Sequence, residues 1–61
     1  MIEFVKVLTN GKNVITFEST REEGLEFWKV NEDGENHLMT YEGGQLYIDN
    51  LLNQGYWQEV E

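Results

Sequence analysis

Nearly all the side chains of this chain that could do chemistry are carboxylates. Twelve Asp and Glu residues stand against four Lys and Arg residues in 61 positions, which gives a net charge of −8. The only histidine is His37, the only serine is Ser19, and there is no cysteine. A nucleophile–histidine–acid arrangement would need both residues, and no nucleophile elbow surrounds Ser19. The sequence therefore argues against covalent catalysis, and we expect no cofactor.

Paired carboxylates are the remaining catalytic possibility. Glu22 and Glu23 could act in general acid–base chemistry if one of them were buried with a raised pKa. They lie in the most polar stretch of the chain, so a solvated turn is the better interpretation. An enzyme that uses buried carboxylates is thus only a minor hypothesis.

A calcium loop can be tested against the spacing around Gly34. With Gly34 at the sixth position of such a loop, Lys29 and Thr40 would occupy the first and twelfth positions. Both positions require carboxylates. We therefore expect no metal site.

Acidic residues concentrate in the segment 18–35. This segment holds seven of the twelve carboxylates against only Arg21 and Lys29, a local charge of −5. Such a field repels nucleic acid and anionic membranes, and it speeds encounter with basic partners. Tryptophan, tyrosine and methionine, which interface cores favour, lie within or just after it. The predicted partner-binding residues are Glu18, Glu22, Glu23, Glu26, Trp28, Glu32, Asp33, Glu35, Met39 and Tyr41.

These residues predict a small acidic, non-catalytic binding module that docks on a protein with a basic surface and modulates or inhibits it. If that partner binds nucleic acid, ordered carboxylates could mimic DNA, whereas direct binding of nucleic acid is not expected from four basic residues. The alternative is a structural subunit that forms a homodimer through an aromatic sheet face. The competing explanation is that the charge serves solubility alone.

In composition the chain resembles many phage accessory proteins. It is short and acidic, it lacks cysteine and proline, and it is rich in Asn, Glu, Tyr and Phe. The resemblance involves no motif and implies only a small accessory protein.

The length predicts a single domain over residues 1–61, close to the lower limit for folding without a disulfide or a metal. Eight aromatic residues supply apolar surface for a hydrophobic core, and dimerisation could bury further apolar surface. No apolar run approaches the roughly 20 residues of a membrane span, and the N-terminus lacks the features of a signal peptide. We expect a cytoplasmic protein that does not bind membranes.

The first predicted element is a β-hairpin over 2–17, which helps to position the predicted partner-binding residues. Asn10-Gly11 is a strong hairpin signal because both residues tolerate positive φ. A two-residue turn there would place Phe4 opposite Phe17. A four-residue loop would preserve the same faces.

The segment 19–30 has two interpretations. A helical turn or loop at 19–24 followed by a strand at 25–30 agrees with the preference of Phe, Trp and Val for strands. A helix from Thr20 to about Lys29 is the rival, supported by the capping-box patterns that Ser19 and Thr20 begin.

A turn at Asp33-Gly34 would complete a second hairpin over about 25–41. It would pair Val30 with His37, Trp28 with Met39, and Glu26 with Tyr41 on one face. The other face would carry Leu25, Phe27 and Leu38. Apolar residues on both faces indicate that the sheet is covered on both sides or that one side meets a partner.

The C-terminal third predicts a helix over about 46–54, with Gly55 at its C-terminal end, and a short strand over 56–60. The alternative is a hairpin about Gly43-Gly44, which leaves 45–49 as strand and only a short helix at 50–54. The predicted fold class is α+β, with an antiparallel sheet and its main helix packed on one face.

Overall fold

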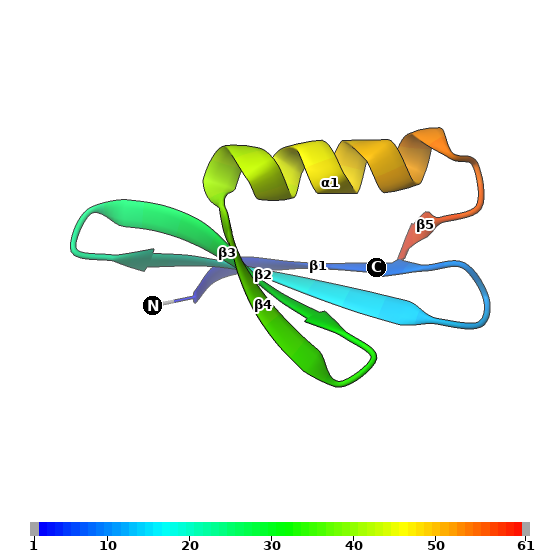
Figure 1. The fold of residues 1–61 in the computed structure, drawn as a ribbon, viewed down its shortest axis with the longest axis horizontal. Coiled ribbons are helices and arrows are strands. Elements are labelled where there is room, and N and C mark those ends of the chain that lie inside the picture. The colour runs from blue at the N-terminus through cyan, green and yellow to red at the C-terminus, as the bar shows by residue number, and fades with distance from the viewer. Residues whose placement is uncertain (1, 61) are drawn as a thin grey trace.

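A computed structural model describes residues 2–60, with the backbone alone for Ile2 and Phe4. Five strands form one antiparallel sheet in the order β4-β3-β2-β1-β5, and one helix lies across it (Figure 1). The predicted α+β class is confirmed. The elements are β1 (Ile2–Thr9), β2 (Val14–Glu22), β3 (Leu25–Glu32), β4 (Glu35–Thr40), α1 (Tyr41–Asn53) and β5 (Gln58–Val60).

The first hairpin is present, but it closes through a four-residue loop. Thr9 pairs with Val14, and Asn10 Oδ1 accepts hydrogen bonds from the backbone nitrogens of Lys12 at 2.9 Å and Asn13 at 2.7 Å. The two-residue register is therefore wrong, and Phe17 lies opposite Lys6 instead of Phe4. The assignment of residues to faces is unchanged because the shift is an even number of positions.

The prediction of a loop or helical turn at 19–24 is wrong, and so is the rival helix. β2 continues to Glu22, and Glu23-Gly24 alone form the turn to β3, with φ of 52° and 80°. Both angles are positive, as a type I′ turn requires. The residues of β2 alternate strictly between the two faces, and this period of two outweighs the local capping pattern.

The second hairpin has the predicted register. Asp33 and Gly34 have φ of 53° and 82°, and Trp28 lies opposite Met39. The predicted pair of Glu26 and Tyr41 is wrong, because β4 ends at Thr40 and Tyr41 begins the helix.

The helix begins five residues before its predicted start, and the alternative hairpin at Gly43-Gly44 is wrong. Thr40 caps the helix, since its Oγ1 accepts a hydrogen bond from Gly43 N at 3.0 Å. Gly44 lies directly against the indole of Trp28, and a Cβ there would be 2.0 Å from Trp28 Cδ1. Gly55, with φ of 83°, follows the C-cap as predicted.

The core lies between α1 and one face of the sheet, here called the helix face. Its buried hydrophobic residues are Leu8, Ile15, Phe17, Trp28, Val30, Ile48 and Leu51. The opposite face, here called the open face, has no element packed on it among the described residues. The short strand that follows the helix, β5, pairs with β1 from Gln58 onward, two residues later than predicted.

Candidate docking surface

Trp28 is a core residue. It is fully buried, its ring stacks on Tyr41 with centroids 5.7 Å apart, and its Nε1 donates to the Tyr41 carbonyl oxygen at 3.1 Å. Phe17 meets the indole edge to face. The interpretation of Trp28 as an exposed anchor is therefore wrong, and α1 covers the sheet face that the homodimer hypothesis requires.

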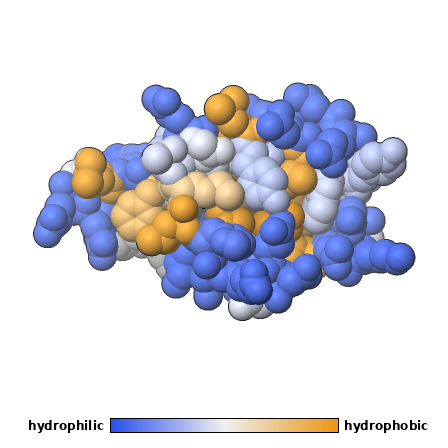
Figure 2. All heavy atoms as spheres, in the orientation of Figure 1, coloured by the Kyte–Doolittle hydropathy of each residue, from blue (hydrophilic) through white to orange (hydrophobic). Residues whose placement is uncertain are grey.

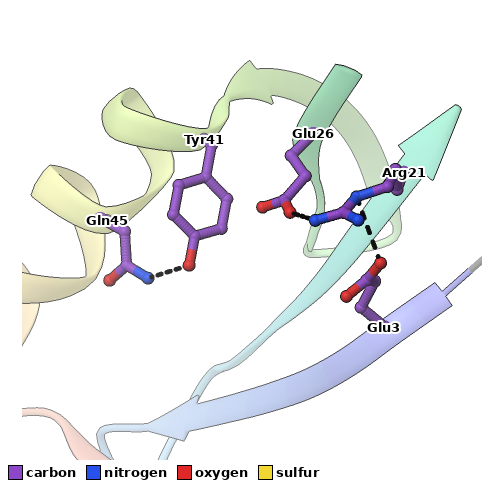
Figure 3. Close-up of polar contacts among 5 residues, drawn as sticks. All are labelled: Glu3, Arg21, Glu26, Tyr41 and Gln45. Carbon is purple, nitrogen blue, oxygen red and sulfur yellow. Dashed lines mark hydrogen bonds and ion pairs between the residues drawn. The ribbon is translucent and has the colours of Figure 1, made fainter. Parts of the chain in front are cut away.

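The two other predicted anchors, Met39 and Tyr41, are half-buried against the core. Tyr41 belongs to the first turn of α1, and its hydroxyl accepts a hydrogen bond from Gln45 Nε2 at 3.3 Å (Figure 3). Met39 contributes to a groove at the edge of the sheet. Part of Met39 is thus available at the surface, whereas Tyr41 mainly packs over Trp28.

The exposed apolar residues of the second hairpin lie on the open face. Leu25 is 71% exposed and Leu38 is 70% exposed, with the half-buried Phe27 on the same face. They form a shallow groove of about 420 Å³ whose lining is mostly apolar. Figure 2 shows hydrophobic surface residues toward the end of the molecule that carries the β2–β3 turn, bordered by hydrophilic ones. The groove residues are Leu25, Glu26, Phe27, Leu38, Met39 and Thr40.

The seven carboxylates of segment 18–35 do not form one cluster. Their positions separate mainly to the two ends of β3, which is eight residues long and therefore about 26 Å from end to end. Glu18 lies between these ends on the open face, opposite Lys29. The group at the β2–β3 turn is Glu22, Glu23 and Glu26, and the group at the β3–β4 turn is Glu32, Asp33 and Glu35. Only the first group adjoins the groove.

Arg21 positions one carboxylate of the group beside the groove. Its guanidinium bonds to Glu26 and lies 3.4 Å, Nε to Oε1, from Glu3 (Figure 3). The hydrogen bond to Glu26, followed by the charge of Glu3, raises the pKa of Arg21. Since these groups are exposed, the contribution to stability is small. The cation holds the Glu26 carboxylate on the helix face, whereas Glu22 lies on the open face opposite Leu25.

Glu32 is tied to the helix. Tyr47 donates its hydroxyl hydrogen to Glu32 Oε1 at 2.7 Å, and its ring meets Phe17 at a centroid distance of 5.7 Å. Burial, together with the bond to Glu32, raises the pKa of Tyr47 to about 12. Glu32 thus fastens the far end of β3 to α1.

The residues considered for catalysis lie apart. Ser19 is buried in β2 opposite Trp28, and its Oγ has no hydrogen-bond partner among the described residues. His37 is exposed on β4, so the whole of β3 separates the two side chains by about 10 Å or more. Across residues 2–60 no group of three or more His, Asp or Glu side chains is placed to hold a metal ion.

The chain matches no protein-family model, and no curated protein or solved structure is significantly similar to it. None of the helices in the described part is long and apolar enough to cross a membrane.

The sequence therefore predicted only some of the residues that line the groove. Glu26 and Met39 were among the predicted residues, and both line it. Leu25, Phe27 and Leu38 were recognised as a second apolar face but were not assigned to the site. The signal that could have identified them was the apolar content of both faces of the hairpin in a chain with one main helix, since one helix covers one face.

Proposed function

We propose that this protein is a non-catalytic binding module that docks on a partner protein through the groove on its open face. The occupant is a segment with a large apolar side chain flanked by Lys or Arg. The apolar side chain fills the space between Leu25, Phe27 and Leu38, and the basic side chains meet the adjacent carboxylates. The observation that carries the proposal is the pair of leucines about 70% exposed on an uncovered sheet face beside an acidic turn.

The exposed apolar residues are contiguous, and this supports a binding role. Single exposed hydrophobic residues are ordinary, but contiguous ones with a polar rim mark interaction sites. Here Leu25 and Leu38 lie on either side of Phe27, the polar rim comes from Glu22 and Thr40, and Glu26 borders the groove from the helix face.

The distribution of charge favours a basic partner. The net charge of −8 steers positively charged surfaces toward the molecule, and the carboxylates at the β2–β3 turn make that attraction local to the groove. A partner that binds nucleic acid fits this description. Because the carboxylates separate to two ends of β3, they favour an apolar anchor with a basic rim over a continuous imitation of a phosphate backbone.

Selection from a displayed library of random 12-residue peptides tests the proposal. We expect enrichment of peptides that carry an aromatic or aliphatic residue beside Lys or Arg. A Leu25→Ser, Leu38→Ser double variant should bind the enriched peptides at least tenfold more weakly, and raising the salt concentration should weaken binding because exposed charges are screened.

Leu46→Ser provides the matched control. Leu46 is 64% exposed on α1, away from the groove, so its replacement removes a comparably exposed leucine from another surface and should leave binding unchanged. Enrichment of acidic peptides, equal binding by the double variant, or no enrichment above a bare support would contradict the proposed function.

A further inference from the structure

The outer edge of β4 is open for pairing. β4 is the terminal strand of the sheet, and no other strand of residues 2–60 pairs with its outer side. Natural proteins protect such edges with proline, lysine, bulges or very short strands. β4 has six residues with neither proline nor lysine, and its register with β3 is unbroken. The opposite edge, β5, has only three residues.

The geometry of the Asp33-Gly34 turn identifies the main-chain groups that face outward. In a two-residue turn the flanking residues, Glu32 and Glu35, bond to each other. Antiparallel pairs alternate between bonded and non-bonded, so residues 35, 37 and 39 bond to β3. The N–H groups of Asn36, Leu38 and Thr40 therefore point away from the sheet, as do the carbonyl groups of Asn36 and Leu38.

The same alternate residues belong to the open face. Leu38 lies opposite Lys29, and Thr40 lies opposite Phe27, so their side chains stand beside the groove. A strand added along β4 would place its own alternate side chains next to Leu38 and would extend the apolar floor. The edge and the groove thus form one continuous binding surface.

Charge selects between a basic strand and a second copy of this chain. Carboxylates stand at both ends of the β4 edge, with Glu35 and Asp33 at its start and Glu42 just after its end. Antiparallel pairing of two β4 strands along their full length would bring Glu35 of each copy beside the helix start of the other, near Glu42. Like charges placed together are unfavourable, whereas Lys or Arg at those positions is favourable.

We propose that the partner binds by β-augmentation, with an extended segment containing Lys or Arg adding to the β4 edge as a sixth strand. The inference builds on the proposed function and specifies its binding mode: main-chain hydrogen bonds to Asn36 and Leu38 supply affinity, and the groove selects apolar side chains.

The test uses the acetylated and amidated peptide Lys-Val-Lys-Val-Lys-Val-Lys at saturating concentration. Amide hydrogen exchange, followed by NMR, should slow at least tenfold at Asn36 and Leu38, and the amides of residues 35, 37 and 39 should change little. A peptide of the same sequence with an N-methyl group on every backbone amide keeps its side chains and charge but has no N–H to donate from either edge, and it should give no protection.

Asn36→Pro removes an outward N–H without breaking a main-chain bond to β3 and should weaken binding at least fivefold. Asn36→Ala loses the same side-chain bond from Asn31 Nδ2 but keeps the outward N–H, so it should bind like the parent protein. Far-UV circular dichroism checks that both variants fold.

Each contrary outcome overturns the inference. The peptide could fail to protect the β4 amides, or the N-methylated peptide or a Glu-Val counterpart could protect them equally. Protection that rises with protein concentration alone would indicate that a second copy of the chain occupies the edge. If library peptides still occupy the groove in a Leu38-dependent manner, β-augmentation is wrong while the proposed function stands.

Discussion

Gly44→Ala is the sharpest test of how α1 sits on the sheet. A helix-propensity argument alone predicts stabilisation, because alanine is favoured over glycine in a helix interior by about 1 kcal/mol. The packing predicts the opposite. The added Cβ would lie 2.0 Å from Trp28 Cδ1 and 2.4 Å from Cγ, whereas carbon atoms in ordinary contact are at least about 3.5 Å apart.

The Trp28 indole cannot easily move away from an added Cβ. Separating the two atoms requires a shift of about 1.5 Å, and Trp28 is fully buried, stacked on Tyr41 and in contact with Phe17. Overpacking of a core costs about 1–3 kcal/mol and sometimes more. We therefore expect a net loss of about 2 kcal/mol or more. A 61-residue domain has a free energy of unfolding of only about 3–9 kcal/mol, so the loss is large.

Urea unfolding followed by tryptophan fluorescence and circular dichroism measures the change, and Tm should fall by about 8–16 °C. Gly43→Ala is the control, because its added Cβ meets only Thr40 Oγ1, at 2.9 Å, and that side chain can rotate. Its effect should stay within about 1 kcal/mol, since the gain in propensity offsets weaker capping. A Gly44→Ala variant as stable as the parent, or more stable, would refute the close contact of α1 with Trp28.

Three further changes test individual contacts. Thr40→Ala should lower the free energy of unfolding by about 1 kcal/mol in urea titrations because the cap on Gly43 is lost, and Thr40→Ser should restore it. The stability from neutral Tyr47 should be complete below pH 10 and decline as the pH rises to about 12, because its folded pKa exceeds the unfolded value; urea midpoints of Tyr47→Phe should lack this part of the decline. Ser19→Ala should be neutral or stabilising in thermal melts, since it removes a buried hydroxyl that has no partner among the described residues; a loss above about 1 kcal/mol would reveal an essential contact.

The parts of the fold that could be predicted were those whose signal is local. The Asp33-Gly34 turn fixed the pairing of Trp28 with Met39 because both turn residues take positive φ in a two-residue hairpin. Glu23-Gly24 forms the same kind of turn but was overlooked, because glutamate rarely adopts positive φ and the neighbouring serine and threonine suggested a helix cap.

The start of the helix and the choice of covered face depend on tertiary contacts. Gly43 and Gly44 have poor helix propensity, yet the helix includes them, since Thr40 caps it and only glycine fits against Trp28. The contact between Gly44 and Trp28 shows which face of β3 the helix covers, and neither the periodicity nor the composition of the sequence indicates that face. Because the groove lies on the uncovered face, its location could not be predicted without knowing which face the helix covers.

The acidity of the chain and its uncovered sheet face are physically coupled. One helix covers one side of the sheet, so several hydrophobic side chains remain in water on the other side, namely Val5, Val14, Leu25, Leu38 and Val60. Two copies that met through this face would bury apolar area, but each carries a charge of −8, and the repulsion opposes their association. The same charge attracts a basic segment to the same face. The net charge therefore favours a basic partner over a second copy, and a high salt concentration, which screens the repulsion, should weaken that preference and promote self-association.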